Sequence, residues 1–172
     1  SLGATPSQIV VAELEDKGLL TNSPVGHVVE ILGTIDEPGM ETEIAVRKFD
    51  LPYKFSEETK KEIKRFSDSV TKSDLRDRVD LRDIPFVTID GADAKDFDDA
   101  VYCLPVEEGK FRLLVAIADV SHYVKPGCSI DKDAQLRTTS VYFPRRVIPM
   151  LPEELSNGLC SLNPQVDRCT MV

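Results

Sequence analysis

The sequence predicts an α+β protein in two parts, a partial small β-barrel followed by a mixed α/β domain. Three observations predict this class. Apolar and polar residues alternate within the first 52 residues, a charged segment with helical spacing follows, and apolar runs typical of strands appear from residue 84 onward. The 172 residues suit one domain, or one small domain and part of another.

Composition narrows the class of protein. Hydrophobic residues make up 41% of the chain, and the net charge of -9 is spread along it, which argues against a simple phosphate-binding surface. The longest strongly apolar stretch, LLVAIA, is too short to cross a bilayer, so we expect no membrane association. Four cysteines without a C-x-x-C pair make a zinc site unexpected. Without a secretory signal, we expect reduced thiols and a cytoplasmic location.

Residues 1–52 are expected to be rich in β-strands. The stretches VGHVVEILG (25–33) and TEIAVRKFDLP (42–52) both alternate apolar and polar residues, and Pro38-Gly39 between them is a turn signal. Such a segment is too short to close a barrel alone, so it is interpreted as part of one.

A charged helical linker is expected over residues 53–82. In SEETKKEIKRFSDSV (56–70), Ser56 is a suitable N-cap, and glutamates follow it in the first turn. Apolar residues then recur on one helical face up to Val70. The charged stretch 71–83 is expected to be a mostly exposed connector.

Residues 83–172 change to a pattern of strands and short helices. IPFVTID predicts a strand, and DAVYCLPVEEGKFRLLVAIA predicts a hairpin that turns at Gly109 and has a buried second strand. A short helix capped by Ser129 is expected to reach Ser140. VYFPRRVIPM is expected to be extended and broken by prolines, and PEELSNGL to begin a helix at Pro152.

The segment Thr88–Tyr102, TIDGADAKDFDDAVY, carries five aspartates and one lysine. At about 4 Å and an effective dielectric of about 20, each carboxylate pair repels by about 4 kcal/mol. A return from strand through loop to strand would bring together Asp90, Asp96, Asp98 and Asp99. Such oxygen ligands suit Mg²⁺ or Mn²⁺, and two such ions can clamp a phosphodiester and activate water.

A solvated charge run and a calcium loop are the other interpretations of this acidic segment. Most charge runs are simply solvated, but these acids are interleaved with FVTI and AVYC, which we expect to be buried strands. A calcium loop is disfavoured, because the twelfth position counted from Asp90 is Val101 rather than glutamate. Asp93 lies outside this set of four and is expected to be a solvated loop residue.

Three longer segments resemble the start of the RNB catalytic domain: DLRDIPFVTIDGADAKDFDDAVYC, LLVAIADVSHYV and TSVYFPRRVIPMLPEELSNGLCSLNPQVDR. The family is that of the RNase II/RNase R exoribonucleases, with its bacterial RNase R branch closest. The upstream VGHVVEILG and PGMETEIAVRKFDLPYKF resemble the end of a cold-shock (OB-type) domain. The resemblance implies a cold-shock part at 1–52, a linker at 53–82 and the N-terminal part of RNB at 83–172.

This resemblance implies a metal-dependent 3′→5′ exoribonuclease that hydrolyses single-stranded RNA to nucleoside 5′-monophosphates with Mg²⁺ or Mn²⁺, two ions in the complete site. The four acidic positions of the family match Asp90, Asp96, Asp98 and Asp99, and the position matching Asp98 is the one most critical for cleavage. The family's nucleotide-stacking tyrosine matches Tyr142.

Several neighbouring residues have open roles. Arg145 and Arg146 follow Tyr142 and are candidate phosphate contacts, although exposed arginines are often only solvated. Asp119 is interpreted as a cap or as support for the metals, with the structural role favoured. A triad of Asp119, Ser121 and His122 is rejected, because neighbours on one strand point to opposite faces.

The remaining site residues of the family lie beyond Val172. We therefore expect no processive nuclease activity from this chain alone, and self-association through uncovered sheet surface. The competing hypotheses are a non-catalytic RNA-binding or regulatory module with the RNB fold, and a phosphoesterase acting on another substrate. The intact set of four aspartates argues against the module, and Tyr142 argues mildly against the phosphoesterase.

Overall fold

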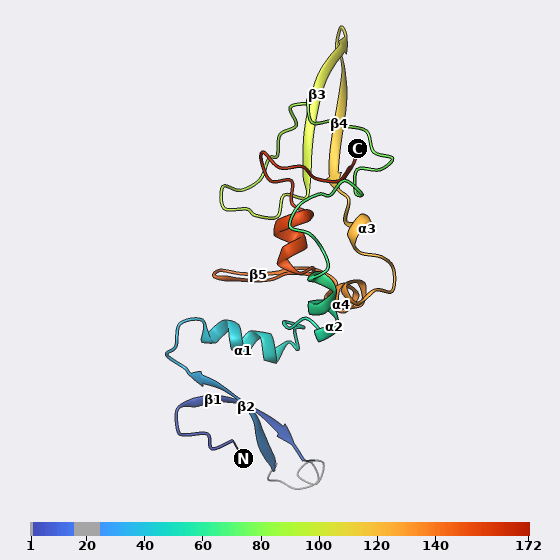
Figure 1. Ribbon diagram of the computed structural model, residues 1–172. Coiled ribbons are helices and arrows are strands. Elements are labelled where there is room, and N and C mark those ends of the chain that lie inside the picture. Colours follow the sequence, from blue (N-terminus) through green and yellow to red (C-terminus); the bar gives the residue numbers. More distant parts are fainter. Residues whose placement is uncertain (1, 16–24) are drawn as a thin grey trace. The chain divides into compact units, whose positions relative to one another are not determined.

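The computed structural model describes residues 2–15 and 25–172 (Figure 1). Helices and strands are mixed throughout, which confirms the α+β class. Within the described residues, no helix is long and apolar enough to cross a membrane. The chain divides into two compact units, the first made of Ser1–Tyr53 with Phe143–Val147, and the second of Lys54–Tyr142 with Ile148–Val172.

The first unit contains an antiparallel strand pair. Strand β1 (Gln8–Leu14) pairs with β2 (Gly26–Thr34), and the register runs from Gln8 opposite Thr34 to Leu14 opposite Gly26. The strand expected over residues 25–33 is therefore confirmed.

The strand expected over residues 42–52 is wrong, because helix α1 (Met40–Lys48) occupies most of this segment. Acidic residues lie in its first turn and basic residues in its last, the arrangement that the helix dipole favours. Arg47 forms an i,i+4 ion pair with Glu43 and donates from Nη2 to Glu30 Oε1 of β2 at 2.6 Å. These charged pairs stabilise a helix in a segment whose apolar residues alternate as in a strand.

The linker helix in the second unit begins where the sequence predicted. Ser56 caps α2 (Glu57–Ile63), and its Oγ accepts the Thr59 N–H at 3.2 Å. The Ser56 N–H donates to Asp133 Oδ2 at 2.8 Å, which ties the start of α2 to a segment 77 residues away. The helix ends at Ile63 rather than continuing to Val70, so its predicted length was wrong.

The main sheet of the second unit is the predicted hairpin (Figure 1). Strand β3 (Asp99–Glu107) pairs with β4 (Lys110–Ala118) around Gly109, whose φ of 71° suits glycine. The short strand β7 (Thr170–Met171) pairs with the end of β4, which gives the order β3-β4-β7.

Two expectations about this sheet are wrong. IPFVTID makes only an isolated bridge, from Val87 to Val101, and Ile89 is 83% exposed. Strand β4 is buried on one face only: Ala116 is 4% exposed, whereas Leu113 is 60% exposed. Side chains alternate between the faces of a strand, and the described core covers only one of them.

Short elements follow the sheet. They are α3 (Val120–Tyr123), α4 (Ser129–Arg137), β5 (Val141–Phe143), β6 (Arg146–Ile148) and η2 (Glu154–Leu159). The cap of α4 is Cys128, whose Sγ accepts the Asp131 N–H at 3.4 Å, so the prediction of Ser129 as the cap was wrong. The prolines of VYFPRRVIPM do not prevent pairing, because β5 and β6 form a hairpin around Pro144.

Element η2 differs from the helix expected after Pro152. It is π-helical, with the Cys160 N–H donating to Leu155 O at 2.8 Å, and its backbone departs from helical angles at Gly158. The core of the second unit forms around this element and includes Ile63, Ala118, Tyr123, Ile130, Leu151, Leu155, Leu159 and Cys160. All four cysteines are free thiols, as the sequence predicted.

Candidate active site

The aspartates lie at the point where the hairpin begins. Asp90 and Asp93 are exposed in the loop that precedes β3, and Asp99 is the first residue of β3, opposite Ile117. The main-chain oxygen of Asp98 accepts the Ala118 N–H at 2.9 Å. The backbone of Asp98 is therefore fixed by the end of β4.

The charges of these aspartates interact. The pKa of Asp98 is raised, first by desolvation and then by the negative charges of Asp96, Asp99 and Asp90. Asp98 is nevertheless an exposed residue, so the desolvation of its carboxylate is only partial. The charges of Asp96, Asp99 and Asp90 thus lie near enough to Asp98 to affect its ionisation.

The donor set fits a hard divalent cation in its chemistry, because it consists of carboxylate oxygens alone. The positions of the carboxylates, however, do not form a complete metal site. Over residues 2–15 and 25–172, no three His, Cys, Asp or Glu side chains are arranged so that they could hold one ion. A bound cation would relieve the like-charge repulsion that, after desolvation, raises the pKa of Asp98.

Tyr142 lies beside this cluster. Its side chain is 64% exposed, and its hydroxyl donates to Asp96 Oδ2 at 2.8 Å. This hydrogen bond is the largest cause of the raised pKa of Tyr142. An exposed aromatic ring thus adjoins the aspartates, although 46 residues separate Tyr142 from Asp96 in the chain.

The two candidate phosphate-binding arginines belong to the first unit, in segment Phe143–Val147. Arg145 is exposed. Arg146 is half-buried, forms an ion pair with Glu43 and lies 5.8 Å from the ring centroid of Tyr53. Arg146 is therefore already engaged by protein groups within its own unit.

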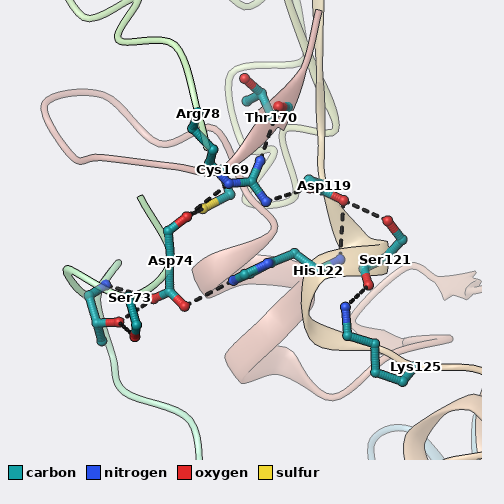
Figure 2. A network of polar contacts seen from close by, with 10 residues as sticks. Ser73, Asp74, Arg78, Asp119, Ser121, His122, Lys125, Cys169 and Thr170 are labelled. Atoms are coloured by element: carbon teal, nitrogen blue, oxygen red, sulfur yellow. Dashed lines mark hydrogen bonds and ion pairs between the residues drawn. The ribbon is translucent and has the colours of Figure 1, made fainter. Parts of the chain in front are cut away.

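A polar network surrounds Asp119, the residue that follows the last residue of β4 (Figure 2). Asp119 is 8% exposed, and its Oδ2 accepts from Arg78 Nη2 at 2.7 Å. Its Oδ1 accepts from Ser121 Oγ at 2.7 Å and from the His122 N–H at 3.1 Å, which caps α3. Burial opposes ionisation of Asp119, but the hydrogen bonds outweigh it and lower its pKa. These contacts indicate that Asp119 has a structural role.

The same network rules out a Ser-His-Asp triad in this segment. Ser121 and His122 lie in α3 rather than on a strand, so the reason given from the sequence was wrong. The Ser121 hydroxyl donates to Asp119, whereas His122 Nε2 bonds Asp74 Oδ1 at 2.9 Å. Serine and histidine therefore face different partners, as Figure 2 shows.

Asp74 should make part of the stability depend on pH. Its pKa is lowered from 3.8 to about 2, first by the Thr71 hydroxyl and then by His122. Because the folded-state pKa is the lower one, Asp74 stabilises the fold above roughly pH 4, and this contribution is lost as the pH falls through about 2. We expect Asp74→Asn to lower the free energy of unfolding by about 1–2 kcal/mol at neutral pH.

Urea unfolding at several pH values tests this expectation. The difference between wild type and Asp74→Asn should shrink as the pH approaches 2, while the exposed neighbour variant Asp68→Asn should change little at any pH. A difference that is the same at neutral and acidic pH would show that the Asp74 carboxylate charge is not the cause.

Comparison with known proteins assigns both parts of the chain. Residues 78–172 match the RNB domain, and residues 1–56 match the cold shock domain. Ribonuclease R of Acidithiobacillus ferrooxidans is 60% identical over 98% of this chain and 39% of its own length. Ribonuclease R of Escherichia coli is 51% identical over 99% of this chain and 21% of its own length. The chain thus spans well under half of these relatives.

Solved structures agree with this assignment. Mycoplasma genitalium RNase R in complex with double-stranded RNA matches with a TM-score of 0.86 and 32% identity, over 95% of this chain and 29% of that one. Yeast Ssd1, described as a pseudonuclease, matches over 95% of this chain and 21% of that one, with a TM-score of 0.65 and 20% identity, a likeness in fold alone. The resemblance expected from the sequence is confirmed, and the chain belongs to the RNB-domain family whose relatives are named Ribonuclease R.

Proposed function

We propose that the native protein containing this chain is a metal-dependent 3′→5′ exoribonuclease that hydrolyses single-stranded RNA to nucleoside 5′-monophosphates. One observation carries the proposal. Within the part of the chain that matches the RNB domain, desolvation and three other carboxylates all raise the pKa of Asp98. A bound cation would offset the repulsion among these carboxylates and favour their charged form.

The residues are assigned roles by chemistry and position. Asp90, Asp96, Asp98 and Asp99 would hold Mg²⁺ or Mn²⁺, two ions in the complete site. When bound, such ions activate a water molecule and stabilise the leaving oxygen. The exposed ring of Tyr142 would stack on a nucleobase, a sequence-tolerant contact that contributes about 1–3 kcal/mol per base.

Two further parts of the proposal concern RNA contacts and context. Arg145 and Arg146 would contact phosphates, Arg146 only by exchanging its ion pair with Glu43. Residues 1–52, 53–82 and 83–172 would serve as cold-shock part, linker and start of the catalytic domain. The free thiols favour a cytoplasmic location.

Metal dependence and product identity test the proposed reaction. The native protein is incubated with a single-stranded RNA and Mg²⁺, and the products are separated by chromatography. We expect nucleoside 5′-monophosphates that no longer form once the metal is chelated, and no processive degradation by residues 1–172 alone. Cleavage that persists in chelator, or products with 3′-phosphates, would contradict the proposal.

A non-catalytic RNA-binding module is the second candidate. A protein described as a pseudonuclease shares this fold, so the fold by itself does not determine activity. The four aspartates are the discriminating feature. A binding module should retain RNA affinity after their replacement and show no hydrolysis before it.

Self-association is the partner prediction for this chain by itself. One face of the β3–β4 hairpin carries apolar side chains that are strongly exposed, among them Phe111 (68%) and Leu113 (60%), and β3 is an edge strand. We expect residues 1–172 to form dimers or larger species in light scattering. Leu113→Glu should shift them towards monomer.

The matched control is Val79→Glu, which adds the same charge at a residue that is 83% exposed and lies outside the sheet. This variant should leave the association unchanged. A wild-type chain that stays monomeric at high concentration would contradict the prediction.

A further inference from the structure

Ser161 is completely buried and lies two residues after the last residue of the π-helical element η2. Its backbone is fixed on both sides: its N–H donates to Gly158 O at 3.0 Å, and its carbonyl oxygen accepts from Arg168 Nε at 2.8 Å. The position of its side chain is therefore set by the core rather than by solvent.

The hydroxyl of Ser161 reaches the acidic segment 66 residues earlier in the chain. It donates to Lys95 O at 2.8 Å and accepts the Phe97 N–H at 3.0 Å. A hydroxyl has one proton to donate, so these contacts use its donor and one of its acceptor positions. One oxygen atom thus holds the residues on both sides of Asp96.

Three other contacts fix the same short segment, residues 95–98, which we call the arc. The Leu162 N–H donates to Phe97 O at 2.8 Å, and the Ala118 N–H donates to Asp98 O at 2.9 Å. The side chain of Asp96 accepts from the Tyr142 hydroxyl. The Ser161 hydroxyl holds the arc from within the core, whereas Tyr142 is exposed.

Such restraint matters because the carboxylates repel one another. Left to themselves, Asp96, Asp98 and Asp99 would separate into solvent, and a divalent ion would have to gather them at the cost of its own binding energy. A backbone held in place beforehand lowers that cost, and groups that orient metal ligands commonly change metal affinity by about 10–100-fold.

We propose that Ser161 is the positioning residue of this site: its hydroxyl holds Lys95 and Phe97, so that the backbone carrying Asp96 and Asp98 is already in place when a divalent cation draws their side chains together. The inference deepens the proposed function and rests on it. Ser161 touches neither metal nor RNA in this role, and acts only through the backbone of the aspartate segment.

Mn²⁺ binding to the native protein tests the proposal without any turnover. Free Mn²⁺ is measured by electron paramagnetic resonance during titration of wild type, Ser161→Ala and Ser161→Gly. Both variants lose the hydroxyl but differ in packing. We expect Mn²⁺ affinity to fall about 10–100-fold in both, and the Mg²⁺ concentration for half-maximal RNA hydrolysis to rise by a similar factor.

The control is Ser156→Ala, in η2, whose hydroxyl contacts Asn157 and not the aspartate segment. It should leave Mn²⁺ affinity unchanged. All titrations use the folded fraction isolated by gel filtration, because a purely structural role would reduce the amount of active protein without moving the metal midpoint.

Each outcome is decisive. Wild-type Mn²⁺ affinity in the folded Ser161→Ala protein would overturn the inference and leave the proposed function intact. Failure of both Ser161 variants to fold would show that the hydroxyl serves the fold, and would also overturn it. If wild type itself binds no Mn²⁺, the proposed function fails and the inference with it.

Discussion

Asp98→Asn is expected to lower the rate of RNA hydrolysis by at least about 100-fold. Mutation of a residue that only supports a metal ligand lowers activity by up to about 100-fold, and loss of a ligand should have at least that effect. Asparagine keeps the shape of the side chain and removes its charge. The pKa of Asp98 is raised by desolvation and by three neighbouring carboxylates, so its negative charge is held there against unfavourable surroundings. RNA affinity should remain close to that of wild type, because the stacking ring of Tyr142 is unchanged.

Asp93→Asn is the matched control. It makes the same chemical change in the same loop, at an exposed aspartate outside the proposed metal set. Single-turnover rates with saturating Mg²⁺ should be near wild type for Asp93→Asn and strongly reduced for Asp98→Asn. Equal rates for the two variants would mean that Asp98 has no special part in the chemistry.

Arg78→Met is expected to lower the free energy of unfolding by about 3 kcal/mol, the low end for breaking a buried ion pair. Methionine keeps much of the apolar length of the arginine side chain. The loss then falls on Asp119, which is 8% exposed and would keep its charge without the guanidinium that bonds it at 2.7 Å. Arg78 also donates to Asp74 O at 2.9 Å, so the connector loosens as well.

Arg76→Met provides the comparison, because Arg76 is an exposed residue of the same connector. Its effect in urea unfolding should stay within about 0.5 kcal/mol. A similarly small effect for Arg78→Met would show that the hydrogen bonds from Ser121 and the His122 N–H are sufficient to stabilise the Asp119 carboxylate.

Local signals in the sequence predicted the elements that local interactions decide. Ser56 caps a helix through a contact three residues away, and Gly109 turns a hairpin between adjacent strands. The same reasoning failed at α1 (Met40–Lys48), where apolar residues alternate as in a strand. There the pairs of Arg47 with Glu43 and Glu30 stabilise a helix, and the second of these partners is 17 residues distant.

The candidate site shows the same division between local and distant contacts. The charge density of the segment pointed to the aspartates, because so many like charges in a short stretch need an explanation. Arg78 and Ser161 were missed, since their partners lie 41 and 66 residues away. Nothing in a single sequence marks one serine as buried or one arginine of a charged connector as paired.

The most direct test of the central claim follows one RNA from both ends. Single-stranded RNA carrying a label at the 5′ end or at the 3′ end is given to the native protein with Mg²⁺. The account predicts that the 5′-labelled strand shortens through a continuous ladder, while the 3′-labelled strand releases its label at once as a mononucleotide. RNA that is bound but stays intact would contradict the account and identify the protein as a binding module.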